Sequence, residues 1–183
     1  MNPFRPGTIL PPMKRTALSL GFGLLAAGLH PVLAIDVPQN RQEFVEAVAA
    51  GAGATKMEQF VVDKGLAEIY AVLEAHVSSC LDVEVRRSSY VGYMEVSSSD
   101  YNPGLRKVSA GRAEFTLQVV NRPRGLGHTP PVGGLYIMAA DLESQGSGRT
   151  EVSLYRPTIG FKPITRTLTQ WLSGEDAACP KMK

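Results

Sequence analysis

The hydrophobic periodicity of this chain changes from helical to strand-like near residue 82, and this change constrains the fold more than any other feature. Between residues 66 and 81, apolar side chains recur at intervals of three and four and so lie on one face of a helix. From residue 83 onward, apolar and polar residues alternate, which is typical of strands with one buried face. The helical set comprises Leu66, Ile69, Tyr70, Leu73, Val77, Cys80 and Leu81. The sequence therefore predicts a long helix followed by a sheet.

Turn-forming residues divide the second half of the chain into short strands. The alternating segments lie near residues 83–86, 91–96, 115–119, 135–139 and 152–155. Asn102-Pro103-Gly104 and Gly146-Ser147-Gly148 predict turns, and we expect the serine-rich stretch 97–100 to be a loop. Because consecutive strands with one apolar face pair most simply with their neighbours, we expect an antiparallel sheet.

Shorter elements flank this core. A short helix is predicted over 40–49 with Asn40 as its cap, and a short strand over 58–62. A closing helix carries Ile164, Leu168, Trp171 and Leu172 at helical spacing and stops at Gly174. The predicted fold class is α+β: an antiparallel sheet of four to six strands, packed against one long helix and a C-terminal helix.

The N-terminal segment has the pattern of an export signal. Lys14-Arg15 precedes an apolar run over residues 16–29, and Val32-Leu33-Ala34 offers small or compact residues for cleavage. As a helix the run would cover about 21 Å at ~1.5 Å per residue, short of the ~30 Å hydrocarbon core. We expect residues 1–34 to be a cleaved signal peptide, which leaves no stable membrane anchor. An uncleaved anchor and a translation start at Met13 are the alternatives.

The predicted mature chain, residues 35–183, is one globular domain of the periplasm or the secreted fraction. Composition excludes several other classes, because 44% of the residues are apolar and 20% are charged. The chain has 19 basic and 17 acidic residues, and three of the basic ones precede residue 35, which leaves 16 against 17 and a sum of −1. This balance gives no electrostatic reason to expect a nucleic-acid partner.

The two cysteines are predicted to form a disulfide. Cys80 lies at the end of the long helix and Cys179 in the C-terminal tail, and pairs of cysteines in an oxidising compartment most often join. A metal site would need further ligands, and neither His76 nor His128 stands at a metal-ligand spacing from a cysteine. We therefore expect no metal and no cofactor.

A family resemblance rests on the end of the chain. Gly148-Arg149-Thr150 leads into the last strand, and Trp171-Leu172-Ser173-Gly174 precedes Cys179-Pro180. With the helix that ends in Cys80, this pattern resembles small exported proteins of Gram-negative bacteria without assigned function. The order of strands and helices is also similar to helix-grip domains. That similarity implies a sheet wrapped around the C-terminal helix and an apolar pocket, but it supplies no catalytic or binding residues.

The segment 122–134 is the strongest loop candidate for binding. It is longer than an ordinary hairpin connection, and it carries Arg122, Arg124 and His128 among prolines and glycines. Three tyrosines near the first hairpin could stack on a ligand or pack in the core: Tyr90, Tyr93 and Tyr101. These six residues are the predicted ligand or partner contacts.

Catalytic constellations are weak by comparison. Asp141 and Glu143 point to the same side of a strand and could act as an acid–base pair, although the adjacent turn suggests that both are solvated. His76 lies one turn before Cys80, which a disulfide would remove as a nucleophile. The favoured hypothesis is a non-catalytic domain that binds a small apolar ligand or an envelope protein. The alternatives are a hydrolase or isomerase acting near His128 or the Asp141/Glu143 pair, and a structural accessory protein of the envelope.

Overall fold

The computed structural model describes residues 37–90, 92, 94–123, 129–146 and 148–182. The predicted signal segment 1–34 and its cleavage site lie outside the described residues. Contacts among residues 35–183 form one compact unit of α+β architecture. Its elements in chain order are α1 (Arg41–Ala49), β1 (Thr55–Val62), α2 (Leu66–Leu81), β2 (Glu84–Tyr90), β3 (Met94–Ser109), β4 (Arg112–Arg122), β5 (Leu135–Ser144), β6 (Thr150–Pro157) and α3 (Lys162–Leu172).

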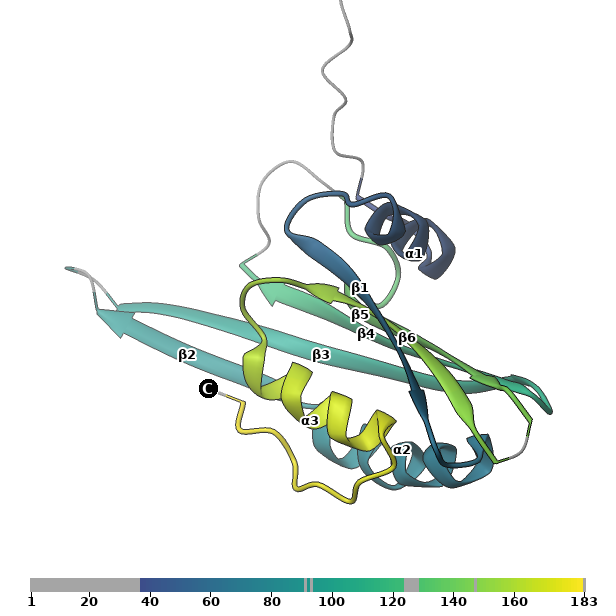
Figure 1. Ribbon diagram of the computed structural model, residues 1–183. Helices are drawn as coiled ribbons and strands as arrows, with labels where there is room; N and C mark the ends of the chain where they lie inside the picture. The colour runs from purple at the N-terminus through teal and green to yellow at the C-terminus, as the bar shows by residue number, and fades with distance from the viewer. Residues whose placement is uncertain (1–36, 91, 93, 124–128, 147, 183) are drawn as a thin grey trace, which may run out of the picture. The chain divides into compact units, whose positions relative to one another are not determined.

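The six strands form one antiparallel sheet in the order β1-β6-β5-β4-β3-β2 (Figure 1). The chain therefore runs from one edge strand, β1, through α2 to the opposite edge strand, β2, and then returns strand by strand to pair β6 with β1. The α+β class and the antiparallel sheet are as predicted. α2 covers the residues for which the apolar spacing predicts a helix.

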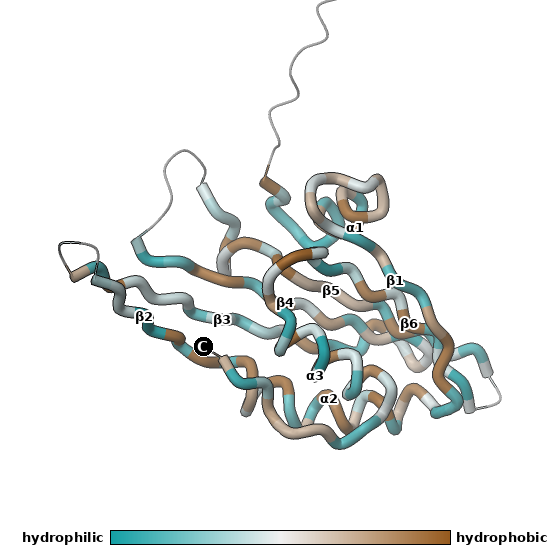
Figure 2. The backbone as a smooth tube through the Cα atoms, turned by 60° about the vertical axis from the view of Figure 1, so that its left-hand side comes forward, coloured by the Kyte–Doolittle hydropathy of each residue, from teal (hydrophilic) through white to brown (hydrophobic). Residues whose placement is uncertain are grey.

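The two faces of the sheet bury different clusters. One face packs against α2 and α3 and holds the main core, in which Phe115, Leu142, Leu168 and Trp171 are fully buried. The other face packs against α1, where Phe44 and its neighbours meet alternate residues of β5 and β6. Figure 2 shows stretches of hydrophobic residues in α2, β1 and β6, and each of these elements contributes residues that pack in or against the main core.

The short helix α1 begins as the sequence predicts. The side chain of Asn40 accepts a hydrogen bond of 3.0 Å from the backbone N–H of Glu43, which satisfies one of the free amides of the first turn. Phe44 and Val48, four residues apart, are the buried pair that holds this helix on the sheet.

The strand β3 corrects two expectations. The stretch 97–100 and Asn102-Pro103-Gly104 were expected to be a loop and a turn, but both lie inside this 16-residue strand. Pro103 is tolerated there because β2 pairs with β3 only as far as Asp100, so the missing N–H of Pro103 faces no ladder partner. At Gly104, a Cβ atom would meet the hydroxyl of Thr116 at 2.6 Å, so glycine admits the close approach of β4.

The hairpin of β2 and β3 extends past the rest of the sheet (Figure 1). The pairing of β3 with β4 ends at Ser98, so residues 94–97 pair with β2 alone. Tyr90 and Met94 close this extension and expose 79% and 72% of their surface. The hairpin end therefore adds little to the core.

Candidate functional site

A groove of about 730 Å³ lies between the start of α3, the C-terminal tail and the strands β2, β3 and β4. This volume falls within the ~300–1,000 Å³ typical of small-molecule sites. Six residues from the strands form the floor: Val85, Arg87, Ser99, Tyr101, Val119 and Asn121. Residues at the start of α3 and in the C-terminal tail form the other wall of the groove.

Strand register explains why these floor residues share one face. Val85 pairs with Ser99, and Ser99 pairs with Asn121 on the next strand. Tyr101 pairs with Val119, two positions further along. Because side chains two apart on a strand point to the same side, the five residues form a continuous patch on the face that packs against α3.

The helix end of the groove is formed by Phe161. This residue precedes α3 with φ at 49°, in the left-handed region that non-glycine residues rarely adopt. Its ring contacts the ring of Tyr101 edge-on, with the centroids 6.5 Å apart. Burial raises the pKa of Tyr101, while the positive charge of Arg87 opposes that rise. An aromatic pair therefore joins the helix to the floor.

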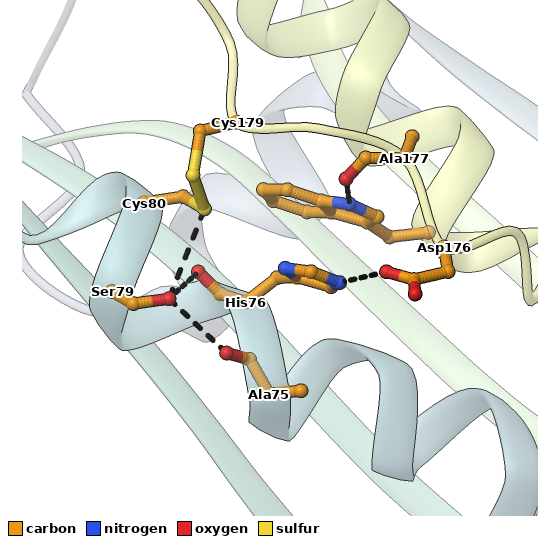
Figure 3. The surroundings of a disulfide bond; sticks show 8 residues. Ala75, His76, Ser79, Cys80, Asp176, Ala177 and Cys179 are labelled. Atoms are coloured by element: carbon orange, nitrogen blue, oxygen red, sulfur yellow. Dashed lines mark hydrogen bonds and ion pairs between the residues drawn. A yellow bond between two sulfur atoms is a disulfide. The ribbon is translucent and has the colours of Figure 1, made fainter.

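A disulfide holds the tail against the groove. The Sγ atoms of Cys80 and Cys179 are bonded, as predicted, and they join the end of α2 to the tail (Figure 3). The next residues, Pro180, Lys181 and Met182, all line the groove. Because the disulfide limits the movement of the tail, it fixes one wall of the groove.

His76 supports the same wall from outside the groove. Its ring stacks on Trp171 with the centroids 5.2 Å apart, and its Nε2 atom pairs with the carboxylate of Asp176 at 2.5 Å (Figure 3). The indole N–H of Trp171 donates to the carbonyl of Ala177 at 2.8 Å. His76 therefore contacts both α3 and the tail, which gives it a structural role.

Positive charge surrounds the groove. Arg87 comes from β2, Lys162 and Arg166 lie one helical turn apart on α3, and Lys181 belongs to the tail. We call these four residues the groove cations. All four side chains are exposed, and no Asp, Glu or His is among the described residues that line the groove. Sequence inspection did not single out these cations, because they come from three separate segments.

Of the three predicted contact residues that the structure describes, Tyr101 lines the groove, whereas Arg122 and Tyr90 do not. Arg122 is exposed at the end of β4, where its guanidinium pairs with Asp100 at 2.9 Å. Tyr90 lies at the hairpin end. Tyr93, Arg124 and His128 lie outside the described residues, so the predicted contacts of these three residues stay predictions.

Of the Asp141/Glu143 pair, Glu143 is solvated as expected, with 54% of its side chain exposed, but Asp141 is not. Asp141 is only 9% exposed, and its carboxylate receives Arg41 at 3.0 Å and Arg112 at 3.1 Å. The adjacent strand β4 supplies Glu114, which also binds both arginines. The alternation of β5 carried no information about these cross-strand and helix partners, which is why the burial was missed.

We call the whole group the ion cluster: Arg41, Arg106, Arg112, Glu114, Asp141 and Glu143. It lies on the α1 face of the sheet, because Glu114 alternates with the core residue Phe115. Three guanidinium groups balance three carboxylates. Burial raises the pKa of Tyr155 beside the cluster, and the charge of Asp141 raises it further. Charges that balance in this way indicate a structural role.

The described residues contain no group of three or more His, Cys, Asp or Glu side chains that could hold a metal ion. Within the same residues, no helix is long and apolar enough to cross a membrane.

Comparison with known proteins does not assign this chain. No protein family, no curated protein and no solved structure matches it. The interpretation of the groove therefore depends on its own geometry and chemistry.

Proposed function

We propose that this chain is an exported, non-catalytic binding domain that holds a small apolar ligand in the groove between α3 and the sheet. The observation that carries the proposal is the groove itself, with its volume of about 730 Å³ and a buried lining that includes Tyr101, Val119 and Ile164. Small-molecule sites are concave and mainly apolar, with a few polar groups that orient the ligand.

The arrangement of the elements supports a helix-grip-like fold as part of this proposal. Such domains hold a C-terminal helix against a curved antiparallel sheet and place an apolar pocket between them. Here α3 packs on the face of the sheet that carries the floor residues, and the groove lies between the two.

The chemistry of the lining favours binding over catalysis. A hydrolase or isomerase needs a general base within reach of its substrate, and the described lining contains neither a carboxylate nor a histidine. Asp141 and Glu143, the paired carboxylates of the enzyme hypothesis, belong to the ion cluster on the other face. An enzyme remains the alternative only through His128.

The disulfide supports export to the periplasm or the exterior. Such bonds form and persist in oxidising compartments and are rare in the cytosol. The joined pair Cys80–Cys179 is therefore the structural observation that agrees with the predicted signal peptide.

A fluorescent dye tests the proposed function. The full chain is expressed, the exported protein is purified, and binding of the uncharged apolar dye N-phenyl-1-naphthylamine is measured by its fluorescence. Ser99→Trp places a large ring on the groove floor, whereas Ser98→Trp places the same ring on the opposite face of β3. We expect dye binding to weaken at least about tenfold in Ser99→Trp, because a filled groove excludes the dye.

The matched variant supplies the control. Ser98→Trp should bind the dye as the wild type does, and the near-UV circular dichroism of both variants shows whether they are folded. The proposal is wrong if the wild type binds no dye, or if folded Ser99→Trp and Ser98→Trp bind it equally.

A further inference from the structure

Three of the four groove cations lack a partner within the described part of the chain. Among the described residues, no side-chain hydrogen bond or ion pair is found for Lys162, Arg166 or Lys181. Residues four apart on a helix lie close together, so the like charges of Lys162 and Arg166 repel each other weakly. No described carboxylate lines the groove to offset them.

This positive charge is local. Residues 35–183 sum to −1, from 16 basic and 17 acidic residues, yet four basic side chains and no acidic one line this single groove. The helix adds to the effect, because α3 begins at the groove and has no acidic residue in its first turn. The positive end of the helix dipole therefore points to the same place as the cations.

Burial separates the lining into two parts. The buried members are mainly apolar or aromatic, namely Tyr101, Val119 and Ile164, whereas the four cations are exposed. A ligand that matches both parts has an apolar portion to fill the interior and a negative group to meet the cations at the surface. A ligand with only an apolar portion would leave the cations without a partner, and a ligand with only a negative group would leave the apolar interior unfilled.

We infer that the ligand of the groove is a single-chain amphiphile with an anionic head group, such as a carboxylate or a phosphate, which Arg87, Lys162, Arg166 and Lys181 receive. This inference rests on the proposed function and specifies its ligand. The guanidinium of Arg166 can bind two oxygens of such a head in a fork, and the lysine ammonium groups act as point charges.

Ligands with one tail and different heads test this inference. Displacement of N-phenyl-1-naphthylamine is measured with dodecyl phosphate, with dodecyltrimethylammonium and with inorganic phosphate. These probes share either the twelve-carbon tail or the phosphate group, so the contribution of each part can be separated. We expect dodecyl phosphate to displace the dye at roughly tenfold lower concentration than the cationic probe. Inorganic phosphate should displace none, and added salt should reduce the preference for the anion.

Variants assign the preference to the groove. In Arg166→Glu, the ratio of the two dodecyl affinities should fall by roughly tenfold or more, because a cation becomes an anion. The control is Arg149→Glu, the same change at an exposed arginine that does not line the groove, and its ratio should equal that of the wild type. The affinity ratio is the readout, since a general loss of the groove would weaken both probes together.

The outcomes separate this inference from the proposed function. If the dye binds but the anionic and cationic probes displace it equally, the groove takes an apolar ligand and the inference about its head group is wrong. If inorganic phosphate competes as well as dodecyl phosphate, the site binds a free anion and the amphiphile is excluded. If the wild type binds no dye, the proposed function itself fails.

Discussion

Two groups of charged side chains lie on opposite faces of the same sheet, and they differ in how their charge is balanced. In the ion cluster beside α1, three guanidinium groups meet three carboxylates at distances of 2.7 to 3.7 Å. Beside α3, the groove cations meet no described carboxylate in the groove lining. The ion cluster thus completes its own pairing, whereas Lys162, Arg166 and Lys181 have no ion pair among the described residues.

Burial explains the difference. Arg41, Glu114 and Asp141 expose between 8% and 14% of their side chains, and a buried charge without a partner is strongly destabilising. Water can solvate the exposed side chains of Lys162, Arg166 and Lys181, so the fold tolerates these charges without internal partners. Balanced, buried charge therefore belongs to the structure, whereas exposed charge of one sign in a groove remains available to a ligand.

The largest expected effect concerns the tail that carries Lys181. Replacing both cysteines, Cys80→Ala with Cys179→Ala, should lower the free energy of unfolding by ~2–5 kcal/mol, because the bond closes a long loop with a sequence separation of 99 residues. It should also weaken the head-group preference by freeing the tail. Urea denaturation measures the stability. An unchanged unfolding midpoint would show that the bond does not support this wall.

The next effect is the loss of a buried partner. Asp141→Asn removes the carboxylate that Arg41 and Arg112 share, and we expect a loss of about 3 kcal/mol in urea denaturation. Dye binding in the groove should stay the same, since the ion cluster lies on the other face. If Asp141→Asn weakened binding without lowering stability, the assignment of the cluster to structure would be wrong.

A smaller effect depends on pH. The guanidinium of Arg156 hydrogen-bonds the carboxylate of Glu58 and lowers the pKa of that group from its ordinary value of 4.5 to about 2. A lowered folded-state pKa adds stability that is present above about pH 4.5 and is lost as the pH falls toward 2. Glu58→Gln should therefore be less stable than the wild type near neutral pH and equal to it near pH 2.

Denaturation curves over this pH range test the linkage. The exposed Glu74 has no ion pair among the described residues, so Glu74→Gln is the control that should follow the wild type. A constant difference between Glu58→Gln and the wild type from neutral pH down to pH 2 would contradict the ion-pair explanation.

The smallest effect completes the comparison. Arg166→Gln removes an exposed groove cation, and we expect its free energy of unfolding to stay within ~0.5 kcal/mol of the wild type. Urea denaturation of Arg166→Gln and Asp141→Asn side by side compares the two losses in free energy of unfolding. A loss comparable to that of Asp141→Asn would mean that Arg166 has a structural partner and is not reserved for a ligand.

The sequence predicted best where one local pattern decided the structure. The spacing of Leu66 to Leu81 determined α2, because a helix needs only its own residues to define an apolar face. The disulfide could be predicted because the chain has two cysteines and the predicted export signal indicates an oxidising compartment. The capping residue Asn40 is likewise a local signal that the structure contains.

The predictions from sequence were wrong where pairing with a neighbouring strand determined the local structure. Asn102-Pro103-Gly104 has the composition of a turn, yet β4 pairs with it and the vacant side of β3 accommodates the proline. The ion cluster also depends on the pairing of Glu114 with Asp141 across two strands and on a helix packed above them. The alternation of apolar and polar residues along one strand does not determine which residues of the neighbouring strands lie opposite it.

The groove was missed for a related reason. Its cations lie at positions 87, 162, 166 and 181, which no short motif connects. Only Lys162 and Arg166 gave a local signal, two basic residues one helical turn apart beside the aromatic Phe161. Tyr101 was singled out among the tyrosines, but its strand position placed it in the floor and not at a hairpin end.

The disulfide also divides the molecule into a covalently closed ring and an open remainder. The strands β2 to β6 and α3 lie between Cys80 and Cys179 in the chain, whereas α1 and β1 lie outside that ring. β1 is an edge strand that pairs with β6 alone, so it can detach while the ring keeps the groove walls together. Its departure would expose the ladder groups of β6 to another chain. We therefore expect hydrogen exchange to be faster in β1 than in β4, and self-association to begin at β6.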